Sequence, residues 1–140
     1  WMLNSKIDSI GWPNCGEIDI MEHVGFDPHK VFFSIHNTNL YGNVHGTSQQ
    51  GVYESNSLEI SFHNYAIEWG ENFIRGYIDD ILYFDYSKNS ESFDDWPYDN
   101  PFFLIINLAI GGEWGGIQGI DNSIFPASFV IDYVRLYIKE

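Results

Sequence analysis

The stretch Phe73-Ile-Arg-Gly-Tyr-Ile-Asp-Asp-Ile-Leu-Tyr-Phe84 decides the fold class, because it has the pattern of a β-hairpin. Two runs rich in β-branched and aromatic residues, 73–78 and 81–84, flank the pair Asp79-Asp80. Aspartate suits a tight two-residue turn, although the glycine that often occupies one of these positions is absent here. We therefore predict two antiparallel strands joined at Asp79 and Asp80.

Similar runs lie on both sides of the hairpin, and no segment of comparable length has a helical period. Many strands separated by turns, without intervening helices, indicate an all-β sandwich in a single domain of 140 residues. Polar, turn-rich connections are expected at 42–51 and 87–100, and Trp69, which follows an alternating run, is expected to be buried. Beyond the hairpin, the predicted strands are 17–24, 31–35, 63–69, 102–109 and 129–138.

The composition argues against several classes of function. Twenty acidic and six basic residues give a formal net charge of −14, so we expect no nucleic-acid partner. No apolar run approaches the roughly 18 residues of a membrane span. Aromatic residues make up 18% of the chain and include five tryptophans, which pack in cores or stack on sugar rings. Cys15 is the single cysteine, which excludes an internal disulfide, and we expect it to be a small buried residue.

Three carboxyl groups lie close together in Gly16-Glu-Ile-Asp-Ile-Met-Glu22. In a regular strand Glu17 and Asp19 share one side, whereas Glu22 points to the other. One extra residue, accommodated as a β-bulge near Ile20 and Met21, would bring Glu22 to the same face. Retaining glycoside hydrolysis needs two carboxyls about 5 to 5.5 Å apart, one to attack and one to donate a proton. Glu17 and Glu22 are therefore a candidate catalytic pair, with Asp19 as an assisting acid.

Two other interpretations of this acidic strand stay open at the level of the residues. Three acids in a strand can simply face water. They can also bind a divalent metal, although the ligand spacing of an EF-hand is absent and the nearby histidines lack a zinc-like spacing. The apolar residues interleaved with the acids favour a strand whose opposite face is buried, which supports a functional surface over a fully solvated one.

The segment Gly16-Glu-Ile-Asp-Ile-Met-Glu-His-Val-Gly25 closely resembles the active-site strand of glycoside hydrolase family 16, in its laminarinase branch. The resemblance extends in order along nearly the whole chain. Its further segments are Trp1-Met-Leu, Gly11-Trp-Pro13, Ile35-His36, Gly46-Thr47, Phe62-His-Asn-Tyr-Ala-Ile-Glu-Trp69, Trp96-Pro-Tyr-Asp-Asn-Pro-Phe102, Ile106-Asn-Leu-Ala-Ile-Gly-Gly112, Trp114-Gly-Gly116 and Ile131-Asp-Tyr-Val-Arg-Leu-Tyr137.

The resemblance implies a β-jelly-roll sandwich of the concanavalin A-like type, with an open cleft on its concave face. It also implies retaining endo-hydrolysis of β-1,3-glucosidic bonds, with Glu17 as nucleophile, Asp19 as assisting acid and Glu22 as acid/base. Full-length members carry further strands before the position of Trp1. Residues 1–140 are therefore expected to form the C-terminal portion of one catalytic domain, unstable and inactive in isolation because strand edges would be exposed.

Four further residues match cleft positions of the family. Trp12 and Trp114 match tryptophans that stack on glucose rings, although core packing is the plain alternative. His36 matches a histidine near the acid/base, where a ring nitrogen would bind a sugar hydroxyl or a carboxyl, and a solvent-exposed strand end is the alternative. Asn107 either satisfies a buried hydrogen bond or faces the cleft.

Asp132 matches a position that helps to bind a structural calcium ion in many relatives, whereas an ordinary buried hydrogen bond is the alternative. No cofactor is expected for catalysis itself. The implied partner is a β-glucan polysaccharide, handled by a monomer outside the cytoplasm, extracellular or periplasmic. Alternatives are a mixed-linkage β-1,3-1,4-glucanase, a galactan-active relative, and a non-enzymatic β-glucan-binding module.

Overall fold

The computed structural model describes residues 1–43 and 49–138, with side chains omitted for 41–43. The expected match at Gly46-Thr47 therefore lies outside the described residues. The chain divides into two units, Trp1–Ile106 and Asn107–Glu140. The first unit contains two antiparallel sheets, which confirms the all-β prediction. No helix among the described residues is long and apolar enough to cross a membrane.

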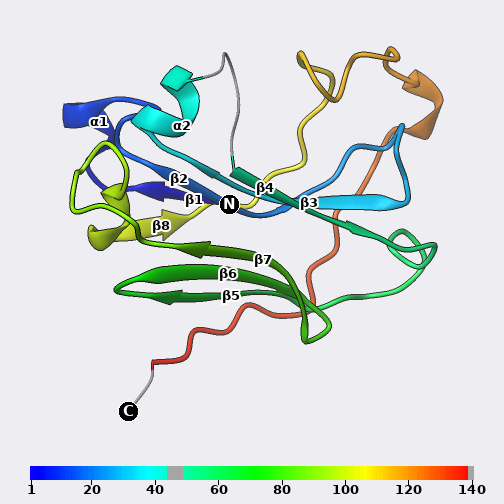
Figure 1. Cartoon of the computed structure of the whole chain (residues 1–140). Coiled ribbons are helices and arrows are strands. Elements are labelled where there is room, and N and C mark those ends of the chain that lie inside the picture. Colours follow the sequence, from blue (N-terminus) through cyan, green and yellow to red (C-terminus); the bar gives the residue numbers. More distant parts are fainter. Residues whose placement is uncertain (44–48, 139–140) are drawn as a thin grey trace. The chain divides into compact units, whose positions relative to one another are not determined.

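The larger sheet has five strands in the order β4-β3-β2-β1-β8 (Figure 1). Its long central members include the predicted acidic strand and the run that follows it, and every neighbouring pair is antiparallel. The strands are β1 (Met2–Asn4), β2 (Glu17–Glu22), β3 (Lys30–His36), β4 (Gln49–Glu54) and β8 (Phe102–Leu104). Strand β4 corrects the prediction of an irregular connection as far as residue 51, because these polar residues pair with the edge of β3.

The smaller sheet has three strands in the order β5-β6-β7, namely β5 (Tyr65–Gly70), β6 (Phe73–Ile78) and β7 (Ile81–Ser87). The predicted hairpin is β6 and β7. Its turn residues Asp79 and Asp80 have φ angles of 46° and 66°, the left-handed backbone of a tight hairpin turn. Aspartate adopts this conformation more readily than most residues, which explains how the turn forms without glycine.

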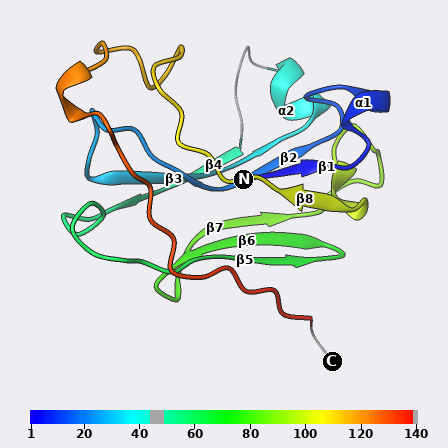
Figure 2. The ribbon, with the colours of Figure 1, turned by 180° about the vertical axis from the view of Figure 1, so that it is seen from behind.

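The core of the first unit lies between these two sheets, which are stacked in both views (Figures 1 and 2). Phe33 of β3 stacks on Phe84 of β7 at 4.6 Å between ring centroids. A Cβ added to Gly76 of β6 would come within 2.3 Å of the Phe33 ring, so only glycine allows this approach. The fully enclosed apolar cluster comprises Ile18, Phe33, Ile35, Ile74, Phe84, Trp96 and Tyr98.

Short helical segments occupy the connections of the first unit: α1 (Ile7–Ile10), α2 (Thr38–Asn43) and the 3-10 turn η1 (Pro97–Asp99). The connection 87–100 was predicted to be polar and turn-rich, yet Trp96, Pro97 and Tyr98 are buried within it. Trp69 was predicted to be buried and is instead 37% exposed. The indole packs edge-on against Phe102, 5.3 Å away, at the margin of the smaller sheet rather than in the core.

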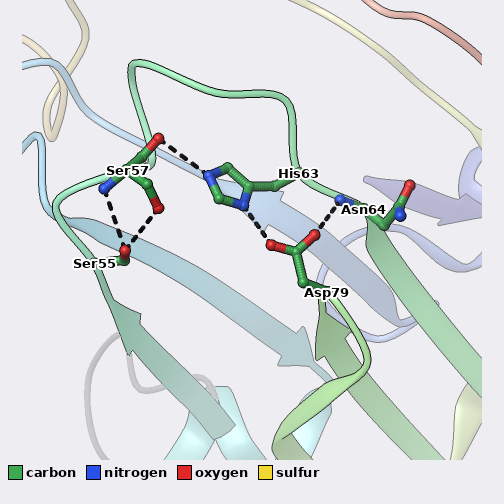
Figure 3. A network of polar contacts seen from close by, with 5 residues as sticks. All are labelled: Ser55, Ser57, His63, Asn64 and Asp79. Atoms are coloured by element: carbon green, nitrogen blue, oxygen red, sulfur yellow. Dashed lines mark hydrogen bonds and ion pairs between the residues drawn. The ribbon is translucent and has the colours of Figure 1, made fainter.

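A polar cluster ties the segment before β5 to the β6–β7 turn (Figure 3). His63 Nδ1 lies 2.5 Å from Asp79 Oδ2, and His63 Nε2 lies 3.1 Å from the Ser57 carbonyl oxygen. Asp79 Oδ1 accepts a hydrogen bond from the Asn64 backbone N–H at 2.9 Å. The predicted strand 63–69 therefore starts at Tyr65, because His63 and Asn64 contact the turn instead of joining the ladder.

The second unit, Asn107–Glu140, has little regular structure among its described residues. Its one helical element is the 3-10 turn η2 (Asn122–Ile124), where Asp121 accepts a hydrogen bond from the Ser123 backbone N–H. The predicted strand 129–138 is wrong for this chain, and the predicted strand 102–109 ends at Leu104. No described strand pairs with residues 129–138, and an extended segment without a ladder partner is not a strand.

Candidate active site

The acidic strand β2 presents all three carboxyl groups on one face of the five-stranded sheet. Glu17, Asp19 and Glu22 pair with residues 36, 34 and 32 of β3. These three partners alternate in steps of two, so they lie on one face of β3. Between Asp19 and Glu22 the strand contains two residues where β3 contains one. The predicted β-bulge at Ile20 and Met21 is therefore confirmed, and it restores Glu22 to the face of Glu17.

Asp19 is the most enclosed of the three carboxyls, with 3% of its surface exposed. Its Oδ2 lies 2.9 Å from His36 Nε2, which is the ring-nitrogen contact to a carboxyl predicted for His36. Burial alone would lower the pKa of His36. The hydrogen bond to Asp19 and the negative charges of Asp19, Glu17 and Glu22 outweigh burial and raise that pKa. The raised pKa favours a protonated His36, whose charge would compensate part of the concentrated negative charge.

Glu17 has a pKa raised to about 7, first because burial disfavours its charged form and second because Asp19 is negatively charged. A hydrogen bond with Asp19 raises this pKa further, whereas the His36 charge and a hydrogen bond from Trp12 lower it. The Trp12 indole is 45% exposed, and its ring centroid lies 5.8 Å from that of His36. Trp12 is therefore an exposed aromatic face beside the carboxyl cluster, and its stacking on a sugar ring stays a prediction.

Glu22 also has a raised pKa, because of burial and then the charge of Asp19. Ser34 Oγ donates a hydrogen bond to Glu22 Oε2 at 2.8 Å, which opposes this rise. Gln50 Nε2 in turn donates to Ser34 Oγ at 3.1 Å. Neither Ser34 nor Gln50 was predicted. Ser34 lies two residues before His36 on β3, so both side chains point to the same face, and this spacing could have identified Ser34. Gln50 lies on a strand that was not predicted.

The loop before Glu17 is fixed by buried contacts that the sequence did not reveal. Gly16 has a φ of 85°, and a Cβ at this position would lie 2.6 Å from Pro97. Asn4 is fully buried, and its Nδ2 donates to the Cys15 and Pro97 carbonyl oxygens at 2.7 and 3.2 Å. Tyr98 donates its hydroxyl to the His36 carbonyl oxygen at 2.9 Å. Cys15 itself is fully buried, as predicted.

Glu17, Asp19 and His36 offer ligand atoms that all lie within 4.8 Å of one another. Among the described residues this is the one such group of His, Cys, Asp and Glu side chains. The 2.9 Å contact between Asp19 and His36 is a direct hydrogen bond, so in this arrangement the residues bind one another. These groups can donate and accept protons, and their atoms also lie close enough together to hold an ion.

The remaining predicted residues belong to the second unit, so their relation to the acidic strand stays a prediction. Trp114 is 38% exposed, and its stacking on a glucose ring stays a prediction. Asn107 is exposed, and both interpretations of its role stay predictions. Asp132 was placed in a strand and is exposed in an irregular segment. The described residues gather no carboxylate cluster around Asp132, and calcium binding there stays a prediction.

A family model, a related protein and a related solved structure each match most of this chain. The family model described as Glycosyl hydrolases family 16 matches residues 1–135. A β-glucanase of Rhodothermus marinus is 44% identical over 144 residues, covering 98% of this chain and 50% of that protein. The structure of a laminarinase from Flavobacterium sp. UMI-01 matches with a TM-score of 0.81 at 43% identity, covering 89% of this chain and 53% of that one.

A third relative is described with an oligosaccharide in place. SCLam, a non-specific endo-β-1,3(4)-glucanase, matches with a TM-score of 0.81 at 36% identity, and its structure presents a 1,3-β-D-cellobiosyl-glucose at the active site. The match covers 89% of this chain and 48% of that one. This chain thus spans about half the length of each of these three relatives.

Proposed function

The chain belongs to glycoside hydrolase family 16, and from this premise we propose that the protein hydrolyses internal β-1,3-glucosidic bonds of β-glucans such as laminarin, with net retention of configuration. The observation that carries the proposal is the bulge in β2, which gathers Glu17, Asp19 and Glu22 on one face beside the exposed indole of Trp12. Two carboxyls on one surface, of which the acid/base candidate Glu22 has a raised pKa, match the needs of a retaining glycosidase.

In the first step, ionised Glu17 attacks the anomeric carbon while protonated Glu22 transfers its proton to the glycosidic oxygen. The bond to the leaving sugar breaks and a covalent glycosyl-enzyme forms. In the second step, Glu22, now ionised, takes a proton from water as the water oxygen attacks the anomeric carbon, and Glu17 is released. The products are two shorter chains, and the anomeric configuration is retained after two inversions.

Burial and the charge of Asp19 raise the pKa values of both glutamates, so the cluster favours retention of a proton. The carboxyls titrate together, and the productive state has the proton on Glu22. The Trp12 hydrogen bond and the His36 charge favour ionised Glu17. Activity should fall on the acidic side as Glu17 is protonated and on the basic side as Glu22 ionises.

The test is release of reducing ends from laminarin and from mixed-linkage glucan by the full-length protein, with Glu17→Ala and Glu22→Ala beside it. We expect each substitution to reduce kcat by roughly 1000-fold or more. Glu71→Gln, which removes a carboxylate at the exposed β5–β6 turn, is a matched control and should leave activity unchanged. Absence of hydrolysis of every β-glucan and galactan by the folded protein would contradict the proposal.

Mixed-linkage hydrolysis is the second candidate, favoured by the description of SCLam as a non-specific β-1,3(4)-glucanase. The ratio of kcat/KM on the two polymers distinguishes the candidates. A β-glucan-binding module without chemistry would be retarded in a laminarin-containing native gel yet release no reducing ends. Because these polymers are too large to enter cells readily, we expect the protein to act outside the cytoplasm, as a monomer.

A further inference from the structure

Two side chains on neighbouring strands form a chain of hydrogen bonds that ends on Glu22. Ser34 lies on the central strand β3 and is 1% exposed. It pairs with Asp19 of β2 on one side and with Gln50 of β4 on the other. The chain runs from Gln50 Nε2 to Ser34 Oγ at 3.1 Å and from Ser34 Oγ to Glu22 Oε2 at 2.8 Å.

The direction of these bonds is fixed by the chemistry of the groups. An amide nitrogen only donates, so the Ser34 oxygen accepts from Gln50. A hydroxyl has a single proton, and with its oxygen engaged by Gln50 that proton is directed at Glu22 Oε2. The Glu22 carboxyl thus accepts a hydrogen bond at Oε2 from the buried Ser34 hydroxyl, which in turn accepts one from Gln50.

We propose that Ser34 and Gln50 are positioning residues, which orient the Glu22 carboxyl through Oε2 and control how readily it gives up and regains its proton. The inference rests on the proposed role of Glu22 as the acid/base. It adds a relay that crosses three strands, from the edge strand β4 to the bulged strand β2. The bulge makes this contact possible, because only the shifted phase brings Glu22 to the face of Ser34.

The consequence for catalysis follows from the charge state that Ser34 stabilises. A hydroxyl donor favours the ionised form of Glu22 and so lowers its pKa, against the effects of burial and of Asp19. The other groups that act on Glu22 are His36 of β3 and the terminal amino group of the chain. Tyr83 of β7 also interacts with the charge of Glu22. None of these is altered by a substitution at Ser34.

The primary test is the pH dependence of kcat/KM for laminarin in the full-length protein and its Ser34→Ala variant. Loss of the donor should raise the Glu22 pKa, so the basic limb should move upward by about 0.5 to 1 pH unit. The value at the optimum should fall roughly 3- to 10-fold, as expected for a misoriented proton donor. Ser34→Thr keeps the hydroxyl and should restore the position of the basic limb.

A second measurement separates proton donation from general damage to the site. An aryl laminari-oligosaccharide with an acidic phenol as leaving group needs little protonation, so Ser34→Ala should affect its first step less than hydrolysis of laminarin. Gln50→Ala should move the basic limb in the same direction by a smaller amount. Gln49→Ala removes the same side chain from the adjacent, opposite-facing position of β4, and should leave the profile unchanged.

The outcomes distinguish the relay from the function on which it rests. An active protein whose Ser34→Ala profile coincides with the original overturns the relay and leaves the proposed function intact. A uniform loss of activity with an unmoved basic limb, equal on both substrates, also overturns it. A protein whose Glu22→Ala variant keeps full activity overturns the assignment of Glu22 and the relay together.

Discussion

At the scale of single residues, burial and then the charge of Asp19 explain why Glu17 and Glu22 have raised pKa values. Asp19 is nearly fully enclosed and hydrogen-bonded to His36, and its charge acts on Glu17 and on Glu22. Burial is the larger cause for each glutamate, and the Asp19 charge is the second. Carboxyl groups gathered in this way place unfavourable negative charge in the folded state.

Glu17→Gln should therefore stabilise the protein at alkaline pH. The folded-state pKa of Glu17 is about 7 against an ordinary 4.5, so the folded state binds more protons between these values. Stability attributable to Glu17 is highest below about pH 4.5 and is lost as the pH rises through 7. With allowance for solvent screening, we expect a gain on the order of 1 kcal/mol at pH 8 and none at pH 4.

Urea denaturation at the two pH values measures this difference, and Glu71→Gln controls for the loss of one negative charge from the molecule as a whole. An equal change in the free energy of unfolding of Glu17→Gln at both pH values would show that burial and Asp19 do not disfavour the ionised form of Glu17. The same data would then weaken the assignment of the acidic limb of the activity profile to Glu17.

Trp12 offers a second residue-scale prediction, because it both presents an exposed ring and donates to Glu17. Trp12→Phe keeps an aromatic face and removes the donor, so the acidic limb of kcat/KM should move to higher pH with little change in KM. Trp12→Ala removes both and should also raise KM about 10-fold, through lost stacking on the sugar. Initial rates across a pH series separate the two effects, and identical behaviour of both variants would refute the dual role.

At the scale of elements, the site depends on the register of β2 against β3. The alternation rule applied to the sequence predicted the need for an extra residue, and the register shift between Asp19 and Glu22 confirms it. Pairing across strands was harder to predict. Gln50 reaches the site only because β4 pairs with β3, and no apolar alternation marks residues 49–54 as a strand.

Deletion of Met21 should abolish activity, because a regular strand would turn Glu22 away from Glu17 and toward the apolar side of the sheet. Stability should fall as well, since an unpaired carboxylate buried among apolar residues is costly. Met21→Ala keeps the residue count and should retain activity within about 10-fold. Reducing-sugar assays and thermal melts of the two variants check this, and an active deletion variant would disprove the role of the bulge.

The His63–Asp79 contact should stabilise the protein in a defined pH window. Its hydrogen bond to Asp79 raises the pKa of His63 above 6.5, and the same contact lowers that of Asp79 below 3.8. The His63 contribution is present below pH 6.5 and is lost as the pH rises through the folded-state pKa. The Asp79 contribution is present above pH 3.8 and is lost at lower pH, so both are complete between about 4 and 6.5.

The free energy of unfolding of His63→Ala should therefore differ from that of the original protein more at about pH 5.5 than at about pH 8.5. His29→Ala, at an exposed loop position, is the matched control and should show no such dependence. A constant difference across this range would mean that the imidazole acts only by packing.

At the scale of the whole molecule, the two units differ sharply in how far the sequence predicted them. The strands of the first unit match their apolar runs because a partner strand and a facing sheet bury them. Residues 129–138 have an equally regular alternation, yet their apolar side chains are exposed. An alternating pattern of apolar residues indicates that a segment can form a strand. A β-ladder also requires a partner strand, and the pattern does not show whether one is present.

Hydrogen exchange should show this difference directly. In the 140-residue chain we expect slow exchange in β2, β3 and β6 and rapid exchange of the amides of 129–138, which lack ladder partners among the described residues. In the full-length protein, 129–138 should become protected if residues 1–140 are the C-terminal portion of one catalytic domain. Rapid exchange of 129–138 in both proteins would contradict that domain assignment.

The extra residue in β2 makes the site depend on the number of residues between Asp19 and Glu22 as well as on the identity of the three acids. Substitutions alter contacts by degrees, whereas gain or loss of one residue exchanges the two faces of everything that follows. A substitution library across β2 would therefore sample only variants in which the three acids already share a face. Anyone grafting a carboxyl pair onto another antiparallel sheet should first vary the number of residues between the two acids, and only then their surroundings.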